Sequence, residues 1–271
     1  MVDLHNHVIF GVDDGSKSLE QSIAMLRQAE EQNISVVCCT PHVHEITKDA
    51  EIDVMIERIE ILRNEIVKNK INIELVLGCE IMFHPRILET VKKFCGTYND
   101  MKSYCLVEFP AFDFPDVTGE LVYELNMEGI TMIIAHPERN GRMAANLDEL
   151  FNLVKYGALL QMDIGSLLGD FGSSTKKACE EIFSYDAYSF AASDSHSLGK
   201  RCFLMDKGYE VISNLKSPEV ADLLLKTNPR KVIEGIKIDN DIIWQNFETQ
   251  MNAKSQNGFM SKIKRIFGSF S

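Results

Sequence analysis

Several histidine and acidic side chains in this sequence come directly after short apolar runs. The first run is followed by His5-Asn6-His7, and Asp13 and Asp14 come a few residues later. An H-x-H triplet alone would also fit two polar residues at the end of an ordinary strand. The pattern recurs, however, in Thr40-Pro41-His42, Gly78-Cys79-Glu80, Val107-Glu108, Ala135-His136 and Ser193-Asp194-Ser195-His196. Because imidazole and carboxylate groups bind divalent metals and transfer protons, the repeated pattern predicts a metal-dependent active site.

The ligand types narrow the choice of metal. All offer imidazole nitrogen or carboxylate oxygen and none offers thiolate, which disfavours a structural zinc site and suits Mn²⁺, Fe or Zn²⁺. Nine ligands are too many for one ion, so we expect two or three ions that share at least one bridging carboxylate. Ions spaced about 3.5–4 Å apart can generate hydroxide for in-line attack on phosphorus. The candidate ligands are His5, His7, Asp13 or Asp14, His42, Glu80, Glu108, His136, Asp194 and His196.

Seven apolar runs must position these residues. They are rich in isoleucine, valine and cysteine and almost continuously apolar, which is typical of strands buried on both faces of a parallel sheet. The runs cover residues 2–4, 34–40, 73–78, 104–107, 131–135, 158–162 and 188–192. Only the sixth, which is followed by Asp163, has no clear place in the ligand set. Amphipathic stretches over 52–69, 117–128, 147–156 and 175–183 predict helices, and Ser18 with Gln21 predicts the start of an earlier one.

This alternation of strands and helices predicts an α/β fold. An open doubly wound sheet that binds nucleotides usually has a glycine-rich loop after its first strand, where this chain has His-Asn-His. We therefore expect a TIM-like (β/α) barrel, in which the carboxyl ends of the strands converge on one face. His44 and His84 are interpreted as ordinary loop residues outside the site.

Composition excludes several classes of function. A net charge of −12 in 271 residues argues against a nucleic-acid partner. The seven cysteines form no C-x-x-C pair, which indicates reduced thiols in a cytoplasmic protein and not a disulfide framework. No apolar run reaches the roughly 18 residues of a membrane span, and we expect no signal peptide.

A resemblance to a known family rests on several motifs in a fixed order. The segments GVDDGSKS, CTPHVHE, LGCEI, LVEFP, IAHPERN, GSLLGDFG and ASDSH together resemble the PHP (polymerase and histidinol phosphatase) family. Within it they are most similar to the bacterial manganese-dependent protein tyrosine phosphatases of capsular and exopolysaccharide operons. The similarity extends from Met1 to about Ile233.

The resemblance implies a distorted seven-stranded barrel with a trinuclear metal centre. By resemblance one ion is held by His5, His7, Glu80 and Asp194, a second by Asp14, His42 and His196, and a third by Glu108 and His136 with Glu80 bridging. Asp13 is an alternative to Asp14. Arg139 is similar to the family's phosphate-binding arginine and Arg201 resembles a second one, while Asp194 and His196 are candidates for proton transfer to the leaving group. From the residues alone, Arg139 would also fit a surface salt bridge with Glu138 or Asp148, and Arg201 would fit a solvated charge.

The implied activity is hydrolysis of phosphotyrosine, and the implied metal is Mn²⁺. Fe or Zn²⁺ could take its place. The implied partner is a membrane-bound tyrosine autokinase that controls polysaccharide export. A small-molecule phosphoesterase of the same fold, such as a histidinol-phosphate phosphatase, is the alternative. No cysteine is followed six positions later by arginine, so the thiol-based tyrosine phosphatases are excluded.

The pattern loosens after Ile238. We expect a PHP metallophosphatase domain over 1–238 and a C-terminal extension over 239–271. In this extension, residues 255–271 interleave lysine and arginine with phenylalanine and isoleucine. This pattern favours peripheral contact with the inner face of an anionic membrane. A helix packed on the barrel or a disordered end is the alternative.

Overall fold

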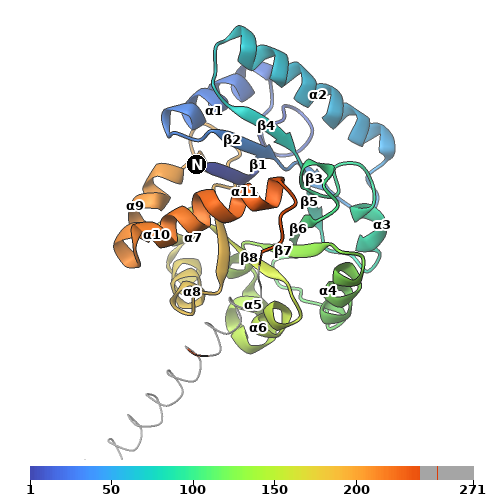
Figure 1. Ribbon diagram of the computed structural model, residues 1–271, viewed down its shortest axis with the longest axis vertical. Helices are drawn as coiled ribbons and strands as arrows, with labels where there is room; N and C mark the ends of the chain where they lie inside the picture. Colours follow the sequence, from blue (N-terminus) through green and yellow to red (C-terminus); the bar gives the residue numbers. More distant parts are fainter. Residues whose placement is uncertain (239–248, 250–271) are drawn as a thin grey trace, which may run out of the picture.

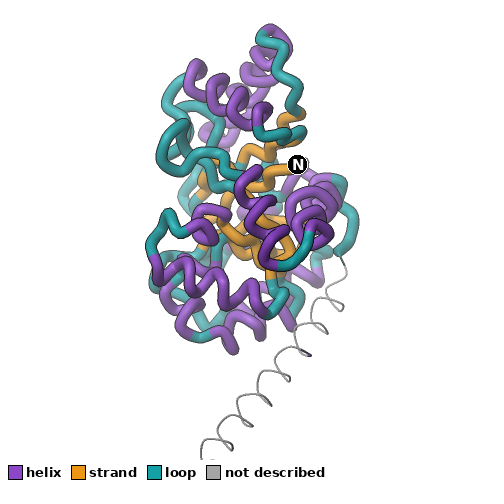
Figure 2. Tube along the Cα trace, turned by 90° about the vertical axis from the view of Figure 1, so that its left-hand side faces the viewer, coloured by secondary structure: helices purple, strands orange, loops and turns teal. Residues whose placement is uncertain are grey.

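Strands and helices alternate through the computed structural model, which describes residues 1–238 and 249 (Figure 1). The strands lie inside and the helices surround them (Figure 2). The strands are β1 (Val2–Asn6), β2 (Val36–Cys39), β3 (His42–Val43), β4 (Glu74–Leu77), β5 (Glu80–Met82), β6 (Tyr104–Glu108), β7 (Thr131–Ala135), β8 (Leu159–Asp163) and β9 (Tyr188–Ala192). The predicted α/β class is confirmed.

All strand pairs are parallel, and they form two sheets. One has the order β1-β2-β4 and the other the order β3-β5-β6-β7-β8-β9. The second and third predicted strands, over 34–40 and 73–78, correspond to β2 and β4, and the structure adds the short strands β3 and β5 just beyond them. Pro41 separates β2 from β3, because proline has no N–H to donate to the ladder. Gly78 lies between β4 and β5, where an added Cβ would be 3.1 Å from the Tyr98 ring. The structure thus assigns nine strands to residues 1–238, and the single seven-stranded barrel stays a prediction.

Helices connect successive strands. They are α1 (Leu19–Glu31), α2 (Asp49–Lys68), α3 (Ile87–Val91), α4 (Thr118–Met127), α5 (Gly141–Ala145), α6 (Leu147–Lys155), α7 (Ile164–Leu168), α8 (Ser173–Ser184), α9 (Met205–Leu215), α10 (Pro218–Asp222) and α11 (Asn228–Ile233). The predicted start of α1 is confirmed, since the Ser18 hydroxyl accepts a hydrogen bond from the backbone N–H of Gln21 at 3.3 Å.

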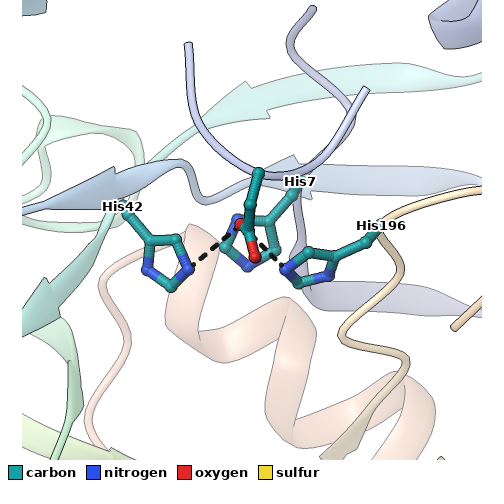
Figure 3. Close-up of side chains that lie close together, drawn as sticks. His7, His42 and His196 are labelled. Atoms are coloured by element: carbon teal, nitrogen blue, oxygen red, sulfur yellow. Dashed lines mark ion pairs between the residues drawn. The ribbon is translucent and has the colours of Figure 1, made fainter. Parts of the chain in front are cut away.

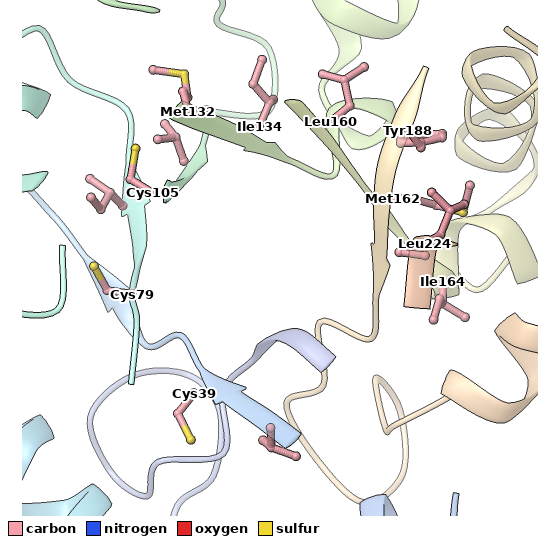
Figure 4. Close-up of a cluster of buried hydrophobic side chains, with 14 of the residues drawn as sticks. Cys39, Cys79, Cys105, Met132, Ile134, Leu160, Met162, Ile164, Tyr188 and Leu224 are labelled. Atoms are coloured by element: carbon pink, nitrogen blue, oxygen red, sulfur yellow. The ribbon is translucent and has the colours of Figure 1, made fainter. Parts of the chain in front are cut away.

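The core lies on both faces of the strands, as the apolar runs predict. Cys38 and Cys39 are neighbours in β2 but belong to different apolar clusters, because successive strand residues point to opposite faces. Figure 4 shows the outer cluster, in which side chains such as Cys105 and Ile134 lie between strands and helices. Tyr98 is buried in the inner cluster, and its hydroxyl donates to the Leu4 carbonyl at 2.9 Å.

Ile238 is the last residue of the continuously described part of the chain. Its backbone N–H donates a hydrogen bond to the hydroxyl of Tyr104 in β6 at 2.8 Å. No helix of the described residues is long and apolar enough to cross a membrane. The predicted membrane-binding segment 255–271 lies outside the described residues.

Candidate metal centre

The predicted ligands come from separate elements and meet at the carboxyl ends of the strands. His5 lies near the end of β1, Glu108 ends β6 and His136 follows β7. His42 and Glu80 come after β2 and β4 and are the first residues of the short strands β3 and β5. The other four lie in the loops after β1 and β9 and are His7, Asp14, Asp194 and His196. All nine belong to four overlapping groups, in each of which the ligand atoms lie within 4.8 Å of one another.

The grouping differs in part from the one that the resemblance implies. The groups are His7, Asp14, His42 and His196; His5, His7 and Glu80; His5, His136 and Asp194; and His42, Glu80 and Glu108. His42 therefore lies near Glu80 and Glu108 as well as near Asp14. His136 is grouped with His5 and Asp194, although its Nε2 is also 3.8 Å from Glu108 Oε1. The division of the ligands among ions stays a prediction.

Glu80 lies at the middle of the cluster and is almost completely buried. Its Oε2 is 3.1 Å from His5 Nε2, 3.3 Å from His7 Nε2 and 3.2 Å from His42 Nδ1. Its other oxygen, Oε1, is 3.1 Å from His136 Nε2. One carboxylate thus faces four imidazoles from both sheets, as expected of a carboxylate that bridges two ions.

The loop after β1 gives the two adjacent aspartates different surroundings. Asp14 Oδ1 lies 3.4 Å from His42 Nε2 and 3.2 Å from His196 Nε2, and its side chain is 61% exposed. Figure 3 shows His7, His42 and His196 converging from separate parts of the chain. Asp13 Oδ2 instead lies 2.8 Å from His7 Nδ1 and accepts from the His42 backbone N–H, so Asp13 orients His7 from behind. Asp14 belongs to one of the candidate ligand groups and Asp13 to none of them, and Asp14 as the ligand stays a prediction.

Asp194 connects the histidine cluster to two arginines. Its Oδ1 faces His5 and His7 at 3.4 Å, and its Oδ2 accepts from Arg139 Nη1 at 2.5 Å and Arg201 Nη2 at 2.6 Å. Both arginines are thereby held at the border of the predicted metal centre. A phosphate that contacts ions in the centre would lie within reach of both guanidinium groups, which are suited to binding its oxygens.

Arg139 is fixed from two further sides. Its Nη1 also lies 3.2 Å from Asp163 Oδ2, and its guanidinium carbon is 4.5 Å from the centroid of the Phe171 ring. Glu138 does not form the surface salt bridge considered above. It is buried and accepts from the Asp163 backbone N–H and from the Tyr188 hydroxyl, both at 2.9 Å.

The described residues show no ion pair between Arg139 and Asp148 either. Arg201 is only 30% exposed and paired with Asp194, so it is not simply a solvated charge. That both arginines bind phosphate stays a prediction.

Three residues of the site have left-handed backbone conformations. They are His136 with φ 32°, Asp194 with φ 49° and Arg201 with φ 56°. Such conformations are uncommon for residues other than glycine and cluster at functional sites, where surrounding structure holds them in place. Here they turn the chain sharply after β7 and β9, which aims these side chains into the cluster.

The electrostatics divide the imidazoles into two kinds. Although burial opposes it, the charges of Glu80 and Asp194 raise the pKa of His5 to about 9. Burial lowers the pKa of both His136 and His196 to about 4, so these rings are neutral at neutral pH. A neutral imidazole can bind a metal directly, whereas His5 must first lose its proton.

The donor set fits divalent cations. In the described chain, three buried atoms of the centre have no hydrogen-bond partner: Nδ1 of His42, Oδ1 of Asp194 and Nε2 of His196. Buried polar atoms without partners are costly. Cations bound among them would supply the missing partners, and mixed nitrogen and oxygen ligands suit Mn²⁺, Fe and Zn²⁺.

Sequence reasoning missed the supporting roles of three residues. Gln161 Oε1 lies 2.9 Å from His5 Nδ1, Asp13 orients His7, and Asp163 anchors Arg139. Two of them gave a signal in the sequence. Gln161 is the polar residue of the otherwise apolar run 158–162, and Asp163 directly follows that run. Of the histidines left out of the site, His84 pairs with Thr90 at 3.1 Å.

His44 lies beside the site, with its ring centroid 6.1 Å from that of His42. It is not a member of the four candidate ligand groups.

Comparison with known proteins places this geometry in a family. The family model described as "Capsular polysaccharide synthesis, CpsB/CapC" matches residues 1–234. The CapC protein of Staphylococcus aureus is 36% identical over 92% of this chain and 97% of its own length. The tyrosine-protein phosphatase YwqE of Bacillus subtilis is 31% identical over 83% of this chain and 88% of its own.

A solved structure from work on YwqE of Bacillus subtilis and CpsB of Streptococcus pneumoniae, described as metal-dependent tyrosine phosphatases, superposes with a TM-score of 0.82. It is 30% identical in sequence and covers 88% of this chain and 96% of its own. The chain therefore belongs to the CpsB/CapC family of capsular polysaccharide synthesis proteins.

Proposed function

We propose that this chain is a metal-dependent protein tyrosine phosphatase that acts in the control of capsule or exopolysaccharide synthesis. The observation that carries the proposal is the position of Asp194, which faces the histidine cluster with one oxygen and holds Arg139 and Arg201 with the other. A site that joins a metal-binding cluster to two arginines is suited to a phosphate monoester. The named activity of the relatives agrees with this chemistry.

The nine predicted ligands would hold the ions, which supply an activated nucleophile and neutralise charge on the phosphoryl group. Both recorded carboxylate contacts of Arg139 use Nη1, which leaves its Nε and Nη2 edge for two phosphate oxygens. Arg201 Nε is buried and without a partner in the described chain, and we assign it to a third oxygen.

Asp194 and His196 are our candidates for proton transfer to the leaving oxygen. The leaving group needs little help from a general acid, because a tyrosine phenol has a pKa near 10 and leaves readily as phenolate.

We infer that Mn²⁺ is the resident metal and that the substrate is the phosphorylated form of a membrane-bound tyrosine autokinase. The mixed nitrogen and oxygen ligands support Mn²⁺ without excluding Fe or Zn²⁺. We place the protein in the cytoplasm, at the inner face of the membrane. Its seven cysteines are free, as expected of thiols in a reducing compartment.

We also propose that the two sheets form one barrel with an interrupted wall. The domain that contains it extends over residues 1–238. Backbone hydrogen bonds cross both gaps between the sheets. Gly78 N–H donates to the Cys39 carbonyl and Glu80 N–H to the Pro41 carbonyl, at 2.9 and 3.1 Å, which continues the β2–β4 ladder towards the β3–β5 ladder. His7 N–H donates to the Ser195 carbonyl at 2.8 Å and joins the loops after β1 and β9. These bonds support a continuous ring of strands whose carboxyl ends share one face.

Turnover of a phosphotyrosine peptide and of histidinol phosphate, each measured with Mn²⁺ and after chelation, tests the proposed activity. We expect the peptide to be hydrolysed with the higher kcat/KM and chelation to abolish the reaction. Faster turnover of histidinol phosphate would support the small-molecule phosphoesterase instead. Activity that survives complete removal of metal would refute the proposal.

A further inference from the structure

A cleft of about 480 Å³ lies beside Arg139 and contains none of the predicted metal ligands. Its volume is within the range of ligand-binding pockets. Arg139 also lines a small cavity of about 80 Å³ that contains Glu108 and His136. The arginine is therefore the boundary between the metal centre and the cleft, and a phosphate bound to it would lie at the head of the cleft.

The walls of the cleft come from three parts of the chain. Small residues of α5 and α8, including Gly141 and Ala178, leave it open. Phe112, in the loop after β6, lies over Gly141, where an added Cβ would be 2.9 Å from the Phe112 ring. The Phe112 side chain is 87% exposed, so an apolar face is available to whatever enters the cleft.

The opposite wall carries an exposed cation. Lys177 of α8 lines the cleft, and the described residues offer it no ion pair. Glu181, one turn later on the same helix, is also exposed and lines the cleft. Glu138 also borders the cleft, but its carboxylate is buried and occupied by the Asp163 backbone and Tyr188. Besides Arg139, Lys177 is therefore the cation of the cleft that can pair with an acidic side chain, and the exposed Glu181 beside it would repel one.

The pocket next to the loop after β1 has the opposite character. It measures about 530 Å³ and is lined by Asp13, Asp14 and Glu51 together with His42 and His44. Asp14 is a predicted metal ligand, but Asp13 and Glu51 would still repel an acidic side chain near the scissile phosphate, whereas Lys177 would attract it. The two pockets thus distinguish substrates by the charge that flanks the phosphorylated residue.

We propose that the cleft beside Arg139 binds the polypeptide that flanks the phosphotyrosine, and that Lys177 selects an acidic side chain close to that residue. Phe112 contributes apolar contact with the same segment. The inference rests on the proposed function and adds to it the chemical class of the preferred protein substrate, an acidic phosphotyrosine segment.

Two phosphotyrosine peptides that differ only in carrying aspartate or lysine within two residues on either side of the phosphotyrosine test this inference. The Mn²⁺-loaded full chain is compared with Lys177→Glu and with Lys176→Glu, which makes the same charge change at the neighbouring residue outside the cleft lining. p-Nitrophenyl phosphate has no flanking chain and reports on the metal centre alone.

We expect the wild-type chain to prefer the aspartate peptide about two- to fivefold in kcat/KM, as for an ion pair at an exposed surface. Lys177→Glu should abolish or reverse this preference, and Lys176→Glu should keep it. Phe112→Ala should lower kcat/KM for both peptides equally. Turnover of p-nitrophenyl phosphate should be the same in all variants.

Equal turnover of the two peptides by the wild-type chain, or an unchanged preference in Lys177→Glu, would overturn the inference. So would equal effects of the two lysine substitutions, because they would reflect overall charge and not the cleft. In these cases normal turnover of p-nitrophenyl phosphate would leave the proposed function standing. If neither the peptides nor p-nitrophenyl phosphate were hydrolysed, the proposed function would fail together with the inference.

Discussion

Replacing Asp13 or Asp14 with asparagine tests two different roles. Asp13 is expected to orient the ligand His7, and Asp14 is expected to bind a metal ion directly. Asp13 is buried against His7, and its Oδ1 also accepts from the Gly15 backbone N–H at 2.9 Å. Asp14 projects between His42 and His196 and is mostly exposed. Asparagine keeps the shape of either side chain and removes its charge, so Asp13→Asn should weaken the metal-free fold, whereas Asp14→Asn should weaken metal binding.

The size of the first effect follows from the pKa of Asp13. Although burial would raise it, the hydrogen bond and charge of His7 lower it from 3.8 to about 2. Because the pKa is lower in the folded state, the stabilisation is present above pH 4 and is lost as the pH falls through about 2. The shift corresponds to about 2 kcal/mol at pH 7, or about 4–8 °C in Tm for a domain of this size.

Asp14→Asn should change the metal-free free energy of unfolding by less than about 0.5 kcal/mol, as is usual for an exposed residue. Its affinity for one ion should fall by more than the 10- to 100-fold typical of residues that only orient ligands. Thermal unfolding of the chelated variants and metal titration by calorimetry measure both quantities. A metal-free Tm that drops for Asp14→Asn and stays constant for Asp13→Asn would refute this assignment.

Three further predictions concern the centre of the site. Elemental analysis should find at least one ion fewer per chain in Glu80→Gln than in the wild-type chain. The control variant Glu74→Gln, at the exposed start of β4, should retain all ions. Equal metal content in the two variants would contradict a bridging role for Glu80. Arg139→Lys should raise KM for p-nitrophenyl phosphate about 10- to 100-fold at unchanged metal content, because lysine lacks the planar fork. The pKa values of His5 and His7 are raised in the metal-free state, His5 to about 9, and burial with the charge of Glu80 raises the pKa of Glu108 to about 7. Metal binding at pH 7 should therefore release at least two protons, and apparent affinity should rise up to pH 9. Calorimetry in buffers of different ionisation enthalpy should detect this release.

The positions of the strands and of their terminal ligands could be predicted from local pattern. Apolar runs identify buried strands, and parallel strands in an α/β fold place their carboxyl ends together. This is why His5, Glu80 and His136 could be expected at one site although they are far apart in sequence. The short strands β3 and β5 were not predicted, because they lie beyond the apolar runs and begin with the polar residues His42 and Glu80.

The contacts around the arginines could not be predicted for a different reason. Asp163 follows its strand as a ligand would, yet its carboxylate faces Arg139 and not the histidine cluster. That choice depends on the left-handed turn at His136 and on the side chain of Glu138, neither of which periodicity reveals. The sharing of one Asp194 oxygen by Arg139 and Arg201 likewise depends on two loops meeting in space.

The most direct test of the account is anomalous diffraction at the manganese edge from crystals of the Mn²⁺-loaded protein. Two or three peaks are predicted among Glu80, His42 and Asp194, with at least one peak in contact with Glu80. An absence of peaks there, or peaks confined to a separate surface site, would contradict a catalytic metal centre at the ends of the strands.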